Sequence, residues 1–371
     1  MSKGSVLSSP VIYEADFVPK ETTSFKTFGI AILPDVISGT VTEELNGAYS
    51  LTMKYPLNGT NAAEIKPKRI LRVLVTDYKE ANGDTPRSAF DFFRIYEVQK
   101  TLTGITVNAK HYVFDIDGFY TPPYRGSLLN FQMNFNRISP NARFYYDSSF
   151  DESSLINIAK TVTLRQAVKG VEGSVIDTLG GEYQCRIQNI KLMQRRGTEK
   201  DVTIKTRNNI TAITYKENTE KQYTGCVATW YNKESGTTVT GSVYYKTGHA
   251  SEPFENIYVY DASSDFQEEP TVADLTAKAE SYYKSNTMGD LKPSISLRFV
   301  PLYQTVEYSG TAAVDYLELG DTVKVTAEEF GIYNLKMRIT RTKFDFVDGR
   351  FTELTLGTTT KSLRDSIKEV K

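Results

Sequence analysis

Metal or acid–base chemistry in this sequence would have to rely on two histidines, His111 and His249. His111 ends an alternating segment that begins at Gly104, whereas His249 lies in the loop 247–250. A catalytic zinc site needs about three protein ligands and an open position, and the sequence has no H-E-x-x-H or H-x-H spacing. We therefore predict no metal site. We interpret His111 as a structural residue at a strand end, whose ring nitrogens bond the backbone or solvent.

Two further patterns imitate catalytic motifs. Lys246-Thr247-Gly248 matches the K-T-G box of penicillin-binding enzymes, and residues 281–284 match their S-x-x-K motif. In those enzymes the serine precedes the K-T-G strand, whereas here it follows, so we reject this match. The acidic pairs Glu43-Glu44, Glu268-Glu269 and Glu328-Glu329 cannot form a glycosidase dyad, because adjacent residues on a strand point to opposite faces. We interpret them as solvated turn or edge charges. The sequence also has no phosphate-cradling G-x-x-x-x-G-K loop, so we predict neither catalytic nor cofactor-binding residues.

Two cysteines, Cys185 and Cys226, are too few and too far apart to form a disulfide framework in 371 residues. We predict two buried free thiols, because free cysteine mostly behaves as a small hydrophobic residue. A reducing compartment fits this prediction.

Basic residues gather in two groups, one formed by Lys66, Lys68, Arg69 and Arg72 and the other by Lys191, Arg195, Arg196 and Lys200. We interpret both as solvated faces and edge-strand protection; the alternative is contact with DNA or with an acidic neighbour. The 44 lysines and arginines are balanced by 45 acids, so no overall basic field favours stable nucleic-acid binding.

The length of 371 residues predicts two to four domains. The amino terminus has no apolar run of signal-peptide length, and no stretch approaches about 18 apolar residues. We therefore expect a chain that is neither exported nor membrane-spanning by its own sequence.

The segment 43–55 predicts a hairpin. Asn46-Gly47 suits a type I′ turn, because both residues tolerate a positive φ. Tyr49, Leu51 and Met53 should then share one face of the second strand.

Most other recognisable segments also predict strands, and 24 tyrosines and 19 phenylalanines suit pleated, half-buried surfaces. Expected strands are 69–75, 92–98, 104–111, 186–192, 201–205, 210–215, 241–245 and several within 294–357. We expect loops at 80–86 and at the turn 319–321, and a domain junction near 112–125.

Four short or amphipathic helices are expected. Thr163 and Gln166 form a capping box, with Gly170 placed to end that helix, and 173–179 should end at Gly180-Gly181. Thr271 can cap a longer helix with Asp274, burying Val272, Leu275, Ala279 and Tyr282. The tail 360–371 is a candidate fourth helix.

Several ordered fragments resemble the tail-hub proteins of tailed bacteriophages, meaning the amino-terminal part of tail-associated lysins and prophage endopeptidase tails. The fragments run in the family's order: Glu43–Tyr55, Phe93–Tyr96, Gly104–His111, Gly173–Ile176, Gly180–Glu182, Arg195–Gly197, Asn208–Ile210, Leu319–Val323, Lys343–Val347 and Leu354–Gly357. The sequence is similar to this family from residue 35 to residue 357.

This resemblance implies a mainly β fold with α+β elements: two small β-barrel hub domains and a mixed helical and strand region, as in phage baseplate hubs. We expect a first barrel domain at 1–113, and a mixed region or the start of the second domain at 114–182. A β-rich middle domain at 183–265 and a helix followed by closing strands at 266–371 would complete the second barrel. The barrels can be discontinuous in sequence, so one barrel can include residues from both sides of these boundaries.

The resemblance further implies a homotrimeric structural virion protein at the tail tip or baseplate, which closes the tail tube and opens for DNA passage. Its expected partners are the distal tail protein, the tail tube, the tape-measure protein and receptor-binding or fibre proteins. Many family members continue into a lytic or fibre domain, whereas this sequence stops soon after Gly357, so we expect no enzyme here. The alternatives are a tail-associated cell-wall hydrolase and a receptor-binding adhesin with a sugar-stacking aromatic surface.

Overall fold

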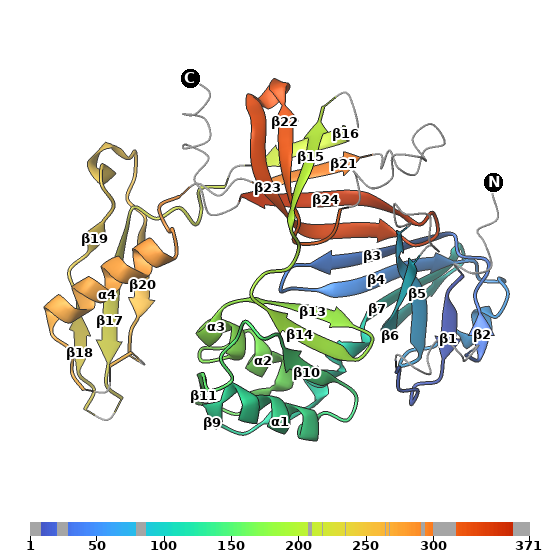
Figure 1. The fold of residues 1–371 in the computed structure, drawn as a ribbon, viewed down its shortest axis with the longest axis horizontal. Helices are drawn as coiled ribbons and strands as arrows, with labels where there is room; N and C mark the ends of the chain where they lie inside the picture. The colour runs from blue at the N-terminus through green and yellow to red at the C-terminus, as the bar shows by residue number, and fades with distance from the viewer. Residues whose placement is uncertain are drawn as a thin grey trace. The chain divides into compact units, whose positions relative to one another are not determined.

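A computed structural model of the chain describes residues 9–20, 29–78, 87–206, 210–216, 218–233, 235–263, 265–266, 268–290, 294–299 and 317–358. The loop expected at 80–86, the tail 360–371 and part of 208–210 lie outside these residues. Strands dominate the described chain, and the expected mainly β fold with α+β elements is confirmed (Figure 1). Two compact units are present: one contains the described residues of 1–214 and 296–356, and the other those of 215–295 and 357–371.

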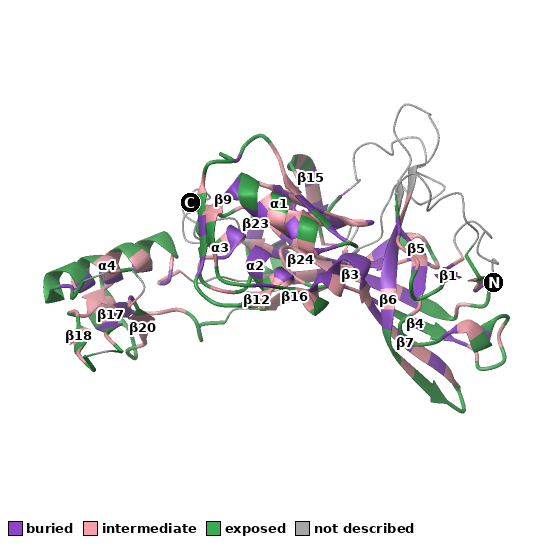
Figure 2. Cartoon of the chain, turned by 90° about the horizontal axis from the view of Figure 1, so that it is seen from below, coloured by how far each residue is buried: buried purple, intermediate pink, exposed green. Residues whose placement is uncertain are grey.

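The first unit begins with antiparallel strands whose alternating residues fill its core. Their bounds are β1 (Val11–Tyr13), β2 (Ala31–Ile32), β3 (Ser38–Glu44), β4 (Tyr49–Tyr55), β5 (Ile70–Tyr78), β6 (Arg87–Thr101) and β7 (Gly104–His111), with the 3-10 helix η2 (Ala62–Glu64) between β4 and β5. The predicted pairing of 92–98 with 104–111 is confirmed, since β6 and β7 form a hairpin. In Figure 2 buried and exposed residues alternate along these strands, as expected of a sheet with one face on the core.

The β3–β4 hairpin has the predicted faces but not the predicted turn. Tyr49, Leu51 and Met53 are all buried, whereas the residues between them are not. Asn46 is left-handed with φ 53°, but Gly47 is not, and the Glu44 N–H donates to the Ala48 carbonyl at 2.8 Å. The two-residue type I′ turn is therefore wrong, and a three-residue loop joins the strands. Contacts of Asn46 with other parts of the chain, described below, account for this difference.

A mixed region follows, beginning with the 3-10 helix η3 (Tyr112–Gly118). Its helices are α1 (Leu128–Ile138), α2 (Leu164–Val168) and α3 (Val175–Leu179), and its strands are β8 (Tyr120–Thr121), β9 (Tyr124–Ser127), β10 (Arg143–Tyr146), β11 (Leu155–Ile158), β12 (Val162–Thr163), β13 (Glu182–Arg186) and β14 (Asn189–Met193). The Thr163–Gln166 capping box and both predicted short helices are confirmed, with α3 ending at Gly180.

The strand predicted at 186–192 is wrong, because two strands and a tight turn occupy this segment. β13 and β14 pair antiparallel on either side of Ile187 and Gln188. Ile187 has φ 54°, which is unfavourable for a β-branched residue. Its N–H donates to the Asp91 Oδ1 at 2.7 Å, and its side chain is buried against Phe92 and Tyr112. These contacts with the first strands offset the local preference of the sequence for a continuous strand.

The closing strands of the first unit pair with its opening strands. They are β15 (Glu199–Lys205), β16 (Ile210–Lys216), β21 (Ser294–Phe299), β22 (Thr322–Ala327), β23 (Ile332–Asp345) and β24 (Arg350–Thr358), with η7 (Glu328–Phe330) before β23. One 13-stranded sheet has the order β16-β21-β24-β23-β3-β4-β7-β6-β5-β1-β2, with β22 and β15 branching from β23. Among the described residues no pairing joins β16 to β2, so closure into two barrels stays a prediction.

The second unit is a small sheet covered on one face by a helix (Figure 1). Its elements are β17 (Gly225–Tyr231), β18 (Thr238–Thr240), β19 (Tyr244–Tyr245), η4 (His249–Ser251), β20 (Ile257–Asp261) and α4 (Val272–Ser285). The capping box at Thr271 and Asp274 is confirmed. Leu275 and Ala279 pack on Trp230 in the core, together with Tyr283.

Two predictions for this unit are wrong in part. Only Tyr244–Tyr245 of the expected strand 241–245 is a strand, because the Ser242 N–H donates to the Thr276 Oγ1 of α4 at 2.9 Å instead of to a strand. Val272 is 51% exposed rather than buried, because the whole first turn of α4 is exposed.

Candidate functional site

Four of the fragments that carry the family resemblance meet at one place in the first unit. They are Asn46-Gly47 of the hairpin turn, Glu182 at the start of β13, Arg195–Gly197 after β14, and Leu319–Asp321 before β22. We call the contact region of these four fragments and Arg338 the junction. It joins the opening strands, the mixed region and the closing strands.

Asn46 holds the hairpin turn against the mixed region. Its Nδ2 donates to the Gly181 carbonyl at 3.0 Å, and its Oδ1 accepts from the Tyr183 N–H at 2.9 Å. The Tyr183 hydroxyl donates to the Gly47 carbonyl at 3.0 Å, and the Lys169 ammonium donates to the Asn46 carbonyl at 2.6 Å. The turn thus satisfies its polar groups with partners far along the chain, which fixes its position relative to α2 and β13.

The centre of the junction is an ion pair between Glu182 and Arg338. The two guanidinium Nη atoms donate to the two carboxylate oxygens at 2.5 and 2.6 Å, in the bidentate geometry that suits arginine. Arg338 also donates to the carbonyls of Gly320 and Arg196, and Glu182 accepts from the Arg196 N–H. Both side chains are less than a fifth exposed. One carboxylate and one guanidinium therefore tie three segments together.

A second ion pair joins Arg196 to Glu43 of β3, with 2.6 Å between the Nη1 and Oε1 atoms. Burial opposes the charge of Arg196, but the charge of Glu43 and their hydrogen bond outweigh it and raise the arginine pKa. Arg195 donates to the Thr322 hydroxyl at 2.6 Å. The solvated face predicted for this basic group is thus wrong for Arg196, and so is the solvated role predicted for Glu43: each has an oppositely charged partner inside the chain.

Backbones approach closely at the junction, and this requires glycine. Gly197 has φ 75°, and a Cβ atom there would lie 2.2 Å from the Gly320 carbonyl carbon. Gly320 has φ 94°, and its Cβ would lie 2.4 Å from the Arg196 carbonyl oxygen. Asp321 lies beside them and accepts from the N–H groups of Thr198 and Glu318 at 2.7 and 2.8 Å. The predicted turn at 319–321 is confirmed as part of this contact.

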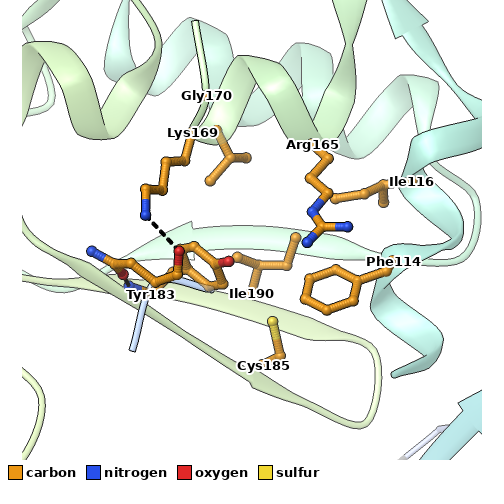
Figure 3. A pocket seen from close by; sticks show the side chains of 10 residues that line it. Phe114, Ile116, Arg165, Lys169, Gly170, Tyr183, Cys185 and Ile190 are labelled. Carbon is orange, nitrogen blue, oxygen red and sulfur yellow. Dashed lines mark hydrogen bonds between the residues drawn. The ribbon is translucent and has the colours of Figure 1, made fainter. Parts of the chain in front are cut away.

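A pocket of about 150 Å³ opens beside the hairpin turn. Figure 3 shows the side chains of Arg165, in α2, and Lys169, directly after α2, pointing towards the β13–β14 hairpin, with Phe114 at one side. The residues lining it are Asn46, Phe114, Ile116, Arg165, Val168, Lys169, Gly170, Tyr183, Cys185 and Ile190. Its volume is below the ~300–1,000 Å³ of sites for drug-sized ligands. The pocket thus suits a group of side-chain size.

The ionisable groups of the pocket are poorly suited to bond-breaking chemistry. Burial raises the pKa of the Cys185 thiol and of the Tyr183 hydroxyl well above their usual values, so both stay protonated. Partial removal from water and the neighbouring charge of Arg165 lower the pKa of Lys169. Arg165 lies over the Phe114 ring at 4.0 Å and donates to Asp117 at 3.2 Å. The lining offers two cations and no carboxylate.

His111 has the structural role predicted for it, although its partners are more specific than expected. The side chain is fully buried, its Nδ1 accepts from the Val113 N–H, and its ring stacks on Tyr49 at 4.6 Å. Its Nε2 lies 2.8 Å from the Asp91 Oδ1. Burial opposes ionisation of Asp91, but the positive charges of His111 and Arg186 and its hydrogen bonds outweigh burial and lower the Asp91 pKa. Asp91 was not anticipated from the sequence.

The remaining sequence candidates are not brought together. His249 belongs to the second unit and stacks on Tyr245, whereas His111 belongs to the first. Lys246 pairs with Glu252, and Ser281 is exposed on α4. Glu328 and Glu329 lie in a 3-10 helix rather than on a strand. Cys185 and Cys226 are both buried free thiols, as predicted.

Two searches of the described residues found nothing further. No group of three or more His, Cys, Asp or Glu side chains among them could hold a metal ion. None of their helices is both long and apolar enough to cross a membrane.

Structural comparison shows which solved proteins share this fold. The fold resembles prophage tail protein gp18 from Listeria monocytogenes EGD-e, with a TM-score of 0.57, 12% identity and 98% of each chain covered. A tail protein from Neisseria meningitidis MC58 is similar at a TM-score of 0.58 and 11% identity, covering 94% of this chain and 96% of that one. The 43 kDa tail protein of prophage MuSo2 from Shewanella oneidensis gives 0.56 and 9%, covering 95% and 98%. The chain therefore has the fold of prophage tail proteins along nearly all its length.

Sequence comparison gives a family match for the carboxy-terminal part of the chain. Residues 198–367 match the family model described as prophage endopeptidase tail. No curated protein sequence matches the chain. The family match and the structural neighbours confirm the resemblance to phage tail-hub proteins that the ordered fragments indicate.

Proposed function

We propose that this protein is a structural component of a phage virion, the hub of the tail tip or baseplate. Three copies form a ring that closes the tail tube before infection and opens for the passage of DNA. The observation that carries this proposal is the likeness in fold to a prophage tail protein over 98% of both chains. The match of residues 198–367 to a prophage tail family supports it independently.

The junction supports a structural role. Its charged side chains pair with one another and with backbone groups, and the thiol and hydroxyl of the adjacent pocket are held protonated. Such groups fix geometry instead of activating a nucleophile or a water molecule. The proposed hub therefore needs no covalent chemistry. Its ring changes between closed and open states, with strands at the subunit interfaces as the two-state element.

The proposed partners follow from a position at the tail tip. They are two further copies of the chain, the distal tail protein, the tail tube and the tape-measure protein, with receptor-binding or fibre proteins further out. The balance of 44 basic and 45 acidic residues suits a wall that DNA passes without lasting contact. Assembly would take place in the cytoplasm of the host bacterium.

Mass and location test the proposal together. Light scattering of the purified protein, alone and mixed with its distal tail partner, should give a threefold mass, and labelled antibody should mark the tail tip in electron micrographs of virions. Label on the capsid or along the tube would overturn the proposal. Release of murein fragments, abolished by one carboxylate substitution, would instead favour a cell-wall hydrolase.

A further inference from the structure

We infer that the pocket between α2 and the β13–β14 hairpin binds a carboxylate group carried by a small apolar body. This inference is independent of the proposed tail function, because it rests on the chemistry of the pocket alone. Arg165 and Lys169 would bind the carboxylate, and the buried lining residues would contact the apolar part of the ligand.

The rim of the pocket has positive charge without a matching acid. Arg165 and Lys169 are its two charged residues, and none of the lining residues is Asp or Glu. Asp117 accepts one hydrogen bond from Arg165 and also lies 3.5 Å from the Lys110 ammonium, so it is shared between two cations. Burial, and after it the neighbouring charge of Arg165, lower the pKa of Lys169, so the two cations repel each other. An anion placed between them removes this repulsion.

Both cations keep hydrogen-bond donors for a ligand. Among the described residues, the Arg165 side chain donates to Asp117 and the Lys169 ammonium donates to the Asn46 carbonyl. A guanidinium has five N–H donors and an ammonium three, so most of these donors have no protein acceptor. Phe114 lies under the guanidinium plane and holds it in place. A planar carboxylate matches the donors of a fixed guanidinium.

The floor of the pocket selects the rest of the ligand. Phe114, Ile116, Val168, Cys185 and Ile190 are all buried residues, and the thiol among them is uncharged. Figure 3 shows Ile190 and Cys185 facing the side chains that reach down from α2. A volume of about 150 Å³ accommodates a branched aliphatic side chain but not a large molecule. A bare phosphate would leave this floor empty, so the pocket favours an amphipathic acid.

The matching chemistry has two sources, the carboxyl terminus of a partner polypeptide and a free short-chain acid. N-acetyl-leucine represents the first source, and 4-methylpentanoate represents the second. N-acetyl-leucinamide has the same body as N-acetyl-leucine without the charge. Titration of each compound into the full-length protein, followed by calorimetry or by NMR shifts, compares the three.

We expect both acids to bind in the millimolar range or tighter and the amide to bind at least about tenfold more weakly. Tighter binding of N-acetyl-leucine than of 4-methylpentanoate would identify a polypeptide terminus, and the reverse order would identify a free acid. Equal binding of acid and amide, or no binding of either acid, would overturn the inference. Displacement of N-acetyl-leucine by equimolar inorganic phosphate would also overturn it.

Substitutions locate the site. Lys169→Gln and Arg165→Gln should each weaken binding of N-acetyl-leucine at least about tenfold. Lys160→Gln and Arg125→Gln are matched controls, because both residues are exposed in the same mixed region and lie outside the pocket lining. Equal losses in the pocket variants and the controls would contradict the assignment. If a pocket variant fails to fold, the comparison of acid with amide on the unaltered protein still decides the question.

Discussion

At the scale of single residues, the Glu182–Arg338 pair is the central contact of the junction, and its loss should destabilise the first unit strongly. Arg338→Met leaves a carboxylate that is 12% exposed without its bidentate partner. Breaking one side of such a buried pair costs about 3 kcal/mol or more, because the remaining charge is neither solvated nor paired. We expect the free energy of unfolding of the first unit to fall by about this amount, measured by urea denaturation with far-ultraviolet circular dichroism.

Lys336 provides a control two residues away on β23. It pairs with Glu199, but both side chains are more than half exposed. Lys336→Met should therefore change stability by less than about 1 kcal/mol. A double variant, Glu182→Gln with Arg338→Met, should recover part of the loss, since no unpaired charge remains. Similar losses for Arg338→Met and Lys336→Met would show that burial does not decide the strength of this pair.

Asp91 should make the stability of the first unit depend on acid pH. Its folded-state pKa lies below the usual value of 3.8 because the charges of His111 and Arg186 and its hydrogen bonds outweigh burial. The stability it contributes is therefore complete above the unfolded pKa and lost as pH falls through the folded pKa. Asp91→Asn should melt lower than the parent at neutral pH.

The difference in melting temperature between Asp91→Asn and the parent should itself depend on pH. Below about pH 4 the gap between Asp91→Asn and the parent should shrink, because the parent also loses its carboxylate there. Thermal melts from neutral to acid pH measure this, with the exposed Asp16→Asn as control. A gap that stays constant down to strongly acid pH would contradict an ionised, stabilising Asp91.

At the scale of elements, the sequence predicted the strand faces, which depend on the local residue pattern. It missed the turn types, which depend on partners far away in the chain. Alternation placed Tyr49, Leu51 and Met53 correctly, because burial of one strand face requires only the sequence of that strand. The turn types at Asn46 and Ile187 were missed, because their hydrogen-bond partners lie 135 and 96 residues away. No local pattern reports such partners.

The candidate site follows the same division. The family fragments Arg195–Gly197 and Leu319–Asp321 were identified as landmarks, but nothing in either fragment shows that their backbones touch. Glu182 and Arg338 lie 156 residues apart in the sequence. Each residue alone has the pattern of any charged residue on a strand. Covariation among related sequences could have linked them, whereas a single sequence contains no such signal.

The Asn46 turn allows backbone strain to be separated from side-chain bonding. Asn46→Ala loses two hydrogen bonds and places alanine at φ 53°, so we expect a loss of about 2–3 kcal/mol. Asn46→Gly keeps the backbone conformation and should cost less. Exposed Asn334, with φ 51°, serves as a control in which Asn334→Ala reports mainly the strain. Urea denaturation compares the three variants with the parent, and an Asn46→Ala loss no larger than that of Asn334→Ala would argue against a docking role for the side chain.

At the scale of the whole molecule, the two compact units have separate cores. The core of the second unit is formed by residues of β17 and α4, including Trp230, Leu275 and Ala279. The ion pairs of the junction belong to the first unit. Substitutions in one core should therefore leave the other core's contacts unchanged, and unfolding need not be a single two-state process.

Trp230 makes this separation measurable, because it is the sole tryptophan of the chain and is only 5% exposed. Leu275→Ala removes a fully buried side chain from its cluster and should destabilise the fluorescence transition by about 2–5 kcal/mol. Val272→Ala, on the exposed first turn of the same helix, should change it by less than about 0.5 kcal/mol. Arg338→Met should move the dichroism transition and leave the tryptophan transition in place. If every variant shifted both signals equally, the chain would unfold as one cooperative unit, and the junction would stabilise the second unit as strongly as the first.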